Sequence, residues 1–286
     1  MTLFQPFIDF DFMRRALLSC LCLSLSATPL GVILSLRRLS LAGDALSHAV
    51  LPGAAVGYLM FGMSTLAMGL GGLIAGLLVA LGAGIISRTT LLKEDASFSG
   101  LYMGALALGI TLISLKGSGM DLLNILFGSL LAVSHSALTT TTLISASSLI
   151  LLRIIYRPLV IDTFDSDFLR VGHRSLAVTI HGVFLFLVVL NLVAGFQILG
   201  TLMSVGLMMV PAVSARFWAV RLVPTMIVAS MIALLSSFIG LLLSWYSALP
   251  AGPAVVLCSA VFFLISCLFG RSNGGLARLS IRRSGV

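Results

Sequence analysis

The chain has 286 residues, of which 59% are hydrophobic and only 9% are charged. Soluble globular proteins carry about 25% charged residues, so this composition excludes a chain whose surface faces mainly water. Lipid is the expected solvent over most of the chain, which predicts an all-α polytopic integral membrane protein. The net charge of +8 comes with no aromatic-rich basic patch, so we expect no nucleic-acid partner.

Apolar runs along the chain predict its membrane spans. About twenty apolar residues cross a bilayer as a helix. Nine runs approach that length, at residues 13–36, 46–62, 65–87, 97–115, 135–155, 175–194, 196–215, 222–246 and 252–269. The stretch 121–133 is apolar but too short to cross, and we expect a re-entrant or interfacial helix there. These elements are expected to form a single membrane domain over residues 1–286.

The distribution of Lys and Arg predicts how the spans are oriented. With the N-terminus outside, nine alternating spans place 14 of the 17 basic residues in cytoplasmic loops or in the C-terminal tail. The outside then holds only Arg14, Arg15 and Lys116. Because cytoplasmic loops carry the excess of basic residues in membrane proteins, we expect the N-terminus outside and the C-terminus in the cytoplasm.

Small residues inside the runs have a packing interpretation. Gly53 and Gly57 are four residues apart, as are Gly72 and Gly76. Such pairs let helix backbones approach closely, so we favour helix packing over a role in a pore. The four cysteines also lie inside apolar runs, without the spacing of a disulfide or metal site, and we expect them to be free.

Ionisable residues within membrane spans are rare and mark functional sites. Asp44 and His48 lie four residues apart in the stretch SLAGDALSHAVLPG, so a helix places both on one face. A carboxylate with an imidazole suits Zn²⁺ or Mn²⁺, and a two-fold dimer would duplicate the pair across a central pathway. From the residues alone, an equally good interpretation is that Asp44 caps the helix and His48 packs. Asp44 also lies only six residues after Arg38, toward the cytoplasmic side.

The remaining histidines each supply a single ligand, so we expect structural roles for them. His181 is expected to pack or hydrogen-bond to a neighbouring helix, whereas His135 begins a span at its outer end and His173 lies in a cytoplasmic loop. The sequence contains no P-loop, HExxH or GxSxG motif, which disfavours an enzyme. If transport is driven by ATP, the ATPase is therefore a separate polypeptide.

The longest polar gap, residues 156–174, contains Pro158, which we expect to end the preceding helix. After it, one of the residues 165–167 can cap a short helix that carries Phe168. Such a cytoplasmic helix is either a loop lying on the membrane surface or a docking element for a soluble partner.

Four stretches resemble, in order, motifs of the permease family of bacterial ABC importers for zinc, manganese and ferrous iron. They are RRLSLAGDALSHAVLPGAAVG at 37–57, DLLNILFGSLLAVS at 121–134, GTLMSVGLMMVPAVSAR at 200–216 and PAGPAVVLCSAVFFLIS at 250–266. The first is similar to the family's Arg-rich loop followed by Gly-Asp-x-x-(Ser/Ala)-His and a small-residue helix. Together the four matches extend over most of the chain.

This resemblance implies a permease of the bacterial cytoplasmic membrane that imports Zn²⁺, Mn²⁺ or Fe²⁺ by alternating access, with no permanently bound cofactor and no enzymatic activity of its own. The implied partners are a second copy of the chain, cytoplasmic ATPase subunits, an extracytoplasmic metal-binding protein and membrane lipid. The resemblance makes Asp44 and His48 the leading residues of the metal path. It also implies that 163–173 is the coupling helix to the ATPase, with family positions at Asp165, Phe168 and Gly172.

Two other classes of transporter remain as alternatives. One is a stand-alone secondary transporter or channel for a divalent cation. The other is a permease for an iron chelate or vitamin, although such permeases are usually longer and the GDALSH stretch disfavours that class. The residues leave the metal open, because a carboxylate with an imidazole suits all three ions.

Overall fold

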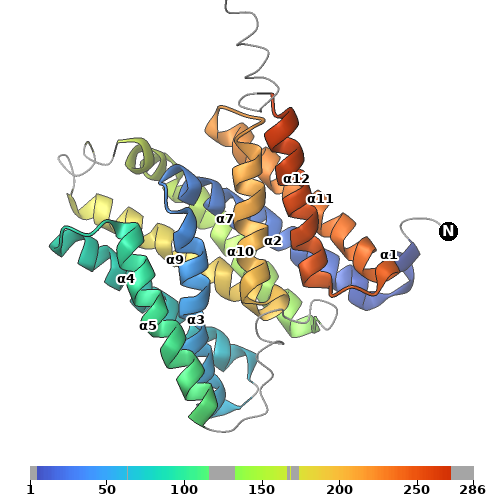
Figure 1. Ribbon diagram of the computed structural model, residues 1–286, viewed down its shortest axis with the longest axis horizontal. Helices are drawn as coiled ribbons and strands as arrows, with labels where there is room; N and C mark the ends of the chain where they lie inside the picture. The colour runs from blue at the N-terminus through green and yellow to red at the C-terminus, as the bar shows by residue number, and fades with distance from the viewer. Residues whose placement is uncertain (1–4, 63, 116–132, 166–167, 169–173, 272–286) are drawn as a thin grey trace, which may run out of the picture.

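The computed structural model describes residues 5–62, 64–115, 133–165, 168 and 174–271, and these ranges contain ten α-helices and no β-strand. The all-α class predicted from composition is confirmed. In chain order (Figure 1) the helices are α1 (Gln5–Asp9), α2 (Asp11–Leu36), α3 (Ser40–Phe61), α4 (Thr65–Thr89), α5 (Glu94–Leu115), α7 (His135–Phe164), α9 (Arg174–Leu199), α10 (Thr201–Ala215), α11 (Leu222–Ser247) and α12 (Ala251–Phe269).

Six of these helices, α2, α4, α7, α9, α11 and α12, are long and apolar enough to cross a membrane, so the chain is a multi-pass membrane protein. Each of the nine predicted runs coincides with a helix, but the count of nine spans is not confirmed. α10 is a shorter apolar helix. α3 and α5 are also outside the six, and in α3 the polar residues Asp44 and His48 reduce the apolar character of the segment.

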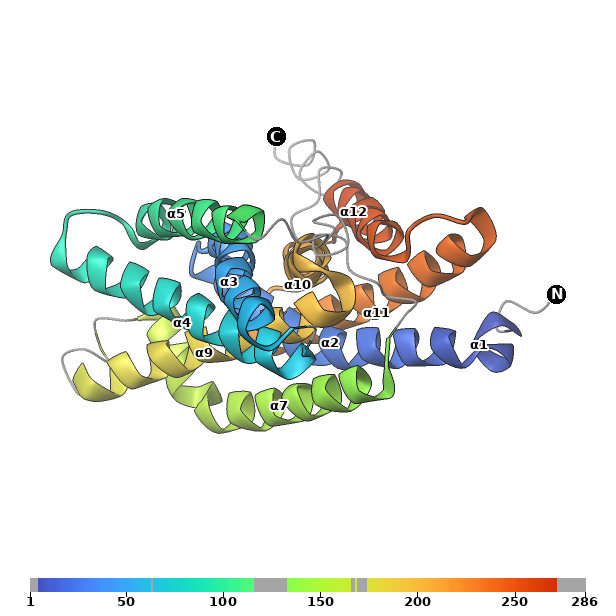
Figure 2. The same cartoon turned by 90° about the horizontal axis from the view of Figure 1, so that it is seen from below.

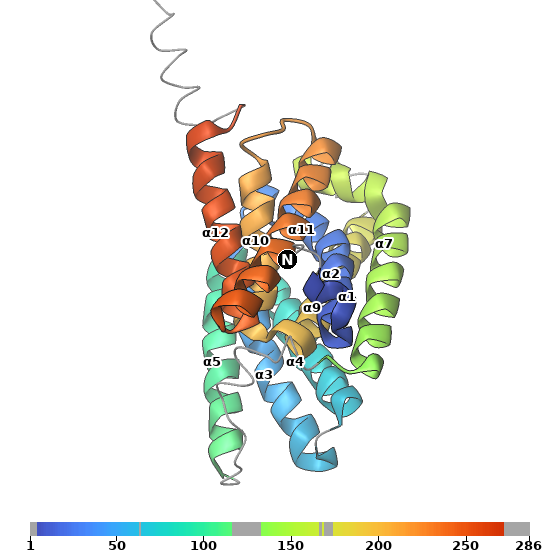
Figure 3. The same cartoon turned by 90° about the vertical axis from the view of Figure 1, so that its right-hand side faces the viewer.

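The helices gather in two groups joined by a central pair. α3, α4 and α5 lie side by side at one end of the molecule, and α10, α11 and α12 lie together at the other (Figure 1). α2 and α9 contact each other and helices of both groups, while α7 covers them from the outside (Figure 2). Figure 3 shows α7 on the opposite edge from α5 and α12.

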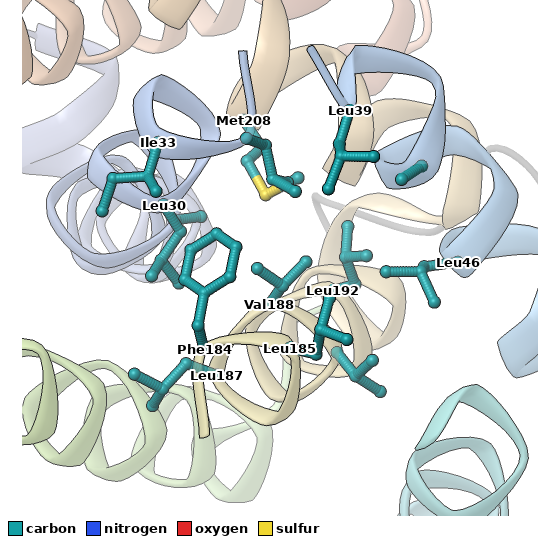
Figure 4. Packing of buried hydrophobic residues seen from close by; sticks show 14 of the residues in the cluster. Leu30, Ile33, Leu39, Leu46, Phe184, Leu185, Leu187, Val188, Leu192 and Met208 are labelled. Atoms are coloured by element: carbon teal, nitrogen blue, oxygen red, sulfur yellow. The ribbon is translucent and has the colours of Figure 1, made fainter. Parts of the chain in front are cut away.

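The largest apolar cluster lies where α9 meets α2, α3 and α10 (Figure 4). Phe184 and Val188 of α9 are fully buried there, as are Leu30 of α2, Leu46 of α3 and Met208 of α10. A helix that is apolar on all sides belongs in the interior of a bundle, which is where α9 lies. The core therefore fixes α2 and α9 relative to α3, the helix that carries Asp44 and His48.

Two predicted boundaries are wrong. α7 continues through Pro158 to Phe164. Proline removes only one backbone hydrogen bond from a helix, and the packing of α7 against α2 and α9 compensates for that loss. The break between the sixth and seventh runs falls at Gly200 rather than at Gly195. Gly200 has a φ of 82°, a conformation that glycine adopts without steric penalty. The short helix expected at 121–133 falls outside the described residues, apart from Val133.

The glycine pairs serve close helix packing, as predicted. Gly53 of α3 and Gly71 of α4 face each other so closely that a Cβ on either would overlap the carbonyl oxygen of the other. Gly57 meets the α4 backbone in the same way, while Gly72 and Gly76 face valine side chains of α3 and α9. The absence of a side chain at these positions lets α4 pack directly on the helix that carries the candidate site.

Substituting Gly71 by Ala is expected to destabilise the protein by about 1–3 kcal/mol, because the added methyl group overpacks the α3–α4 contact. Gly84 provides a matched control in the same helix, since a Cβ there would meet nothing within 4 Å. Thermal unfolding of the detergent-purified protein should show a lower Tm for Gly71→Ala and no loss for Gly84→Ala. Equal melting temperatures for the two variants would contradict the packing assigned to α3 and α4.

Candidate metal path

A tight turn sets where the candidate site begins. The N–H of Leu39 donates to the carbonyl of Leu34 at 3.0 Å, and the N–H of Arg38 donates to that of Ser35 at 3.3 Å. These two bonds define a Schellman motif, in which the residue at Arg38 takes a left-handed conformation, here with a φ of 62°. Leu34 and Leu39 also belong to one buried cluster, as this motif favours. The start of α3 is therefore fixed relative to the end of α2.

Asp44 and His48 occupy the one open stripe on an otherwise buried part of α3. From Ala42 to Ala55, every residue is buried except these two. The side chain of Asp44 is 47% exposed and that of His48 is 18% exposed. Nε2 of His48 lies 3.7 Å from Oδ1 of Asp44. The structure thus brings the predicted pair together on one face of the helix.

The capping role considered for Asp44 does not fit the geometry. The N-cap of α3 is Leu39, and Asp44 lies in the second turn, so Asp44 does not cap the helix. Nδ1 of His48 is buried and has no hydrogen-bond partner among the described residues. Leaving a buried polar atom unpaired costs about 1–3 kcal/mol, so this nitrogen does not contribute to the packing of the ring.

The ring of His48 stacks on Tyr102 of α5, with centroids 6.1 Å apart and an interplanar angle of 25°. Sequence analysis missed Tyr102, because no local motif links it to α3. Its position in the middle of an apolar run was the only available signal. Tyr102 orients the imidazole from the neighbouring helix. The sequence alone does not show which helices are neighbours, so this contact could not be predicted from it.

One chain brings two potential ligands together at this place. Among the described residues, no group of three or more His, Cys, Asp and Glu side chains could hold a metal ion. A carboxylate and an imidazole are suitable ligands for Zn²⁺, Mn²⁺ or Fe²⁺, but stable sites for these ions use four or more. The pair therefore has the chemistry of half a metal site.

The other predicted residues lie elsewhere. His181 forms contacts of 3.1 Å with both Arg37 and Glu94, as expected for a histidine that bonds to neighbouring helices. His135 is exposed at the first position of α7, and His173 is outside the described residues. All four cysteines are free.

The expected coupling helix is described in part. Thr163 and Phe164 belong to the end of α7, so the predicted start at residue 163 is wrong. Oδ1 of Asp165 accepts a hydrogen bond of 3.0 Å from the N–H of Phe168, the pattern of a helix N-cap. Phe168 is 68% exposed. Gly172 and most of the remaining segment lie outside the described residues.

Six helices long and apolar enough to cross a membrane define a multi-pass membrane protein. Comparison with known proteins agrees: the chain belongs to the ABC 3 transport family, whose profile matches residues 9–270. The permease family inferred by resemblance is therefore confirmed, and the chain is a transport permease.

Individual relatives cover nearly the whole chain. It is 32% identical to the manganese transport system membrane protein MntC of Halalkalibacterium halodurans, over 96% of this chain and 93% of the relative. It is 33% identical to the manganese import system permease protein ScaB of Streptococcus parasanguinis, over 91% and 92%. The fold is similar to that of PsaBC from Streptococcus pneumoniae in complex with Fab, with a TM-score of 0.84, 30% identity and 98% of both chains covered.

Proposed function

We propose that this chain is the permease subunit of an ABC importer that moves a divalent transition metal, Mn²⁺ first among Zn²⁺, Mn²⁺ and Fe²⁺, into the cytoplasm. The observation that carries the proposal is the Asp44–His48 pair on the open stripe of α3. The relatives named for manganese transport favour Mn²⁺ over the other two ions.

Two copies of the chain would complete the site. A two-fold axis near α3 duplicates every residue on that face, so two carboxylates and two imidazoles would line one path. The carboxylates of Asp44 offset the loss of hydration of a dication, and the imidazoles of His48 add ligands that suit transition metals better than Mg²⁺ or Ca²⁺. A path of this kind must bind weakly enough to release its ion, and four ligands that have to converge from two subunits meet that requirement.

Transport would proceed by alternating access between the two copies. An extracytoplasmic binding protein would deliver the ion to the outward-open state, and cytoplasmic ATPase subunits would drive closure through the segment around Asp165 and Phe168. The N-terminus would lie outside and the C-terminus inside, as the distribution of basic residues favours. The exposed ring of Phe168 supports docking, because it offers an apolar anchor next to a capped turn.

The second candidate, a stand-alone secondary transporter or channel, differs in its energy source. Proteoliposomes containing the chain alone should import no ⁵⁴Mn²⁺ down a cation or proton gradient. Proteoliposomes containing the chain with its ATPase subunits should import it when ATP and loaded binding protein are present. Uptake by the chain alone would establish the alternative and contradict the ABC importer.

The metal is identified by competition in the same vesicles. Unlabelled Mn²⁺ is expected to suppress ⁵⁴Mn²⁺ uptake at lower concentration than Zn²⁺ or Fe²⁺ does. Stronger suppression by Zn²⁺ or Fe²⁺ would reassign the cargo while leaving the class of transporter unchanged.

A further inference from the structure

A buried cluster of charged side chains joins four helices at one end of the bundle. Arg37 follows the last residue of α2, Asp162 lies in the last turn of α7, His181 lies in α9 and Glu94 begins α5. Nη2 of Arg37 lies 2.8 Å from Oδ2 of Asp162, and their side chains are only 9% and 8% exposed. Burial lowers the pKa of the Arg37 guanidinium, Asp162 and Glu94 oppose that shift, and the group stays charged.

Each of the three guanidinium nitrogens of Arg37 contacts a different side chain. Besides its ion pair with Asp162, Nε donates to Oγ1 of Thr163 at 3.2 Å, and Nη1 lies 3.1 Å from Nδ1 of His181. The guanidinium also stacks 4.8 Å from the ring centre of Phe184. A planar guanidinium with several fixed donors can hold such an arrangement, whereas the single ammonium of lysine cannot.

The direction of the hydrogen bonds follows from the donors. A guanidinium donates only, so Nδ1 of His181 must accept from Arg37. The neutral ring then carries its proton on Nε2, which faces Oε1 of Glu94 at 3.1 Å. Hydrogen bonds from Arg37 therefore link α2 to α7 and α9, and a 3.1 Å contact of His181 with Glu94 continues to the first residue of α5.

One side of this cluster touches both helices that flank the expected coupling segment. Asp162 and Thr163 lie immediately before Asp165, where α7 ends. His181 lies two turns into α9, the next helix after the segment. Arg37 is bonded to the end of α7 and to α9, so a partner that shifts either helix also shifts Arg37.

The other side of the cluster leads to the Asp44–His48 pair by two routes. Arg37 lies within the Schellman turn that fixes the start of α3, directly before the left-handed residue Arg38. Glu94 begins α5, and Tyr102 lies eight residues later in that helix, where it stacks on His48. Arg37 therefore adjoins the start of α3, which carries His48, and Glu94 begins α5, which carries Tyr102.

We propose that Arg37 is a positioning residue that couples movement of the end of α7 and the start of α9 to the Asp44–His48 pair. The inference rests on the proposed function, because it assigns a path between an ATPase contact and a metal path. Arg37 is not a metal ligand in this proposal. It acts by holding α7, α9 and the α2–α3 turn as one unit, so that these elements change position together.

The test compares Arg37→Lys with Arg38→Lys in the full complex of permease, ATPase and binding protein in proteoliposomes. Lysine at 37 keeps a cation opposite Asp162 but cannot bond Thr163 and His181 at the same time, whereas Arg38 is exposed and outside the cluster. We expect Arg37→Lys to lower the number of ions imported per ATP hydrolysed by about tenfold, a typical coupling between sites. ATP hydrolysis itself and the Tm of the complex should match those of Arg38→Lys.

A second variant separates coupling from the ion pair. His181→Leu leaves Arg37 and Asp162 together but removes the bond from Arg37 to α9 and the contact with Glu94, and it should lower the same ratio. An unchanged ratio in both cluster variants would overturn the inference. So would a parallel fall of uptake, hydrolysis and folded complex, because the cluster would then be structural only. Failure of the unaltered complex to import with ATP would reject the proposed function first, and this inference with it.

Discussion

Replacing Asp44 by Asn, or His48 by Ala, is expected to reduce metal uptake at least about tenfold, equivalent to about 1.4 kcal/mol or more. Asn keeps the shape of Asp44 but removes the charge that offsets dehydration of the ion. Ala removes the imidazole of His48 altogether. Because both side chains sit on the open stripe of α3, the variants should fold and assemble as the unaltered protein does.

The measurement is initial ⁵⁴Mn²⁺ uptake in cells whose own permease has been deleted, with membrane levels and dimer assembly checked in parallel. Asp9→Asn and His135→Ala are matched controls, since both residues are exposed and lie outside α3. Uptake near the unaltered rate in both pair variants would remove Asp44 and His48 from the path. Equal loss in the controls would point to a general effect on expression.

Replacing Phe168 by Ser is expected to weaken binding of the ATPase subunits by about 2 kcal/mol, or roughly thirtyfold, as truncation of an aromatic anchor does. Phe168 is 68% exposed in the isolated chain and follows the capping contact of Asp165. A partner that covers this ring would therefore lose buried apolar surface in the variant.

Phe61 offers a control with the same side chain and 69% exposure, at the far end of α3 from the Schellman turn. Titration of purified ATPase subunits onto the permease in nanodiscs should show a higher Kd for Phe168→Ser and no change for Phe61→Ser. The same Kd for all three proteins would show that Phe168 is not in the docking surface.

Features with a local cause could be predicted from the sequence. The apolar runs predicted the helices because length and hydropathy are local properties. Asp44 and His48 were placed together because a four-residue spacing on a helix fixes their side chains on one face. The pairing of Gly53 and Gly57 with a neighbouring helix followed from their spacing, although the sequence did not identify α4 as that neighbour.

Features that depend on other helices could not be predicted in this way. Pro158 predicted a helix end, but packing of α7 on α2 and α9 sustains the helix past it. Tyr102 reaches His48 only because α5 packs beside α3. Arg37 read as one of many basic loop residues, and its burial against Asp162 depends on residues more than a hundred positions away.

The most direct test of the proposed shared Asp44–His48 site is the number of Mn²⁺ ions bound per chain of the purified protein. Titration followed by the EPR signal of free Mn²⁺ should show one ion bound for every two chains. That binding should disappear in His48→Ala and persist in His135→Ala. One ion per chain, or binding unaffected by His48→Ala, would contradict a metal path formed by this pair from two copies.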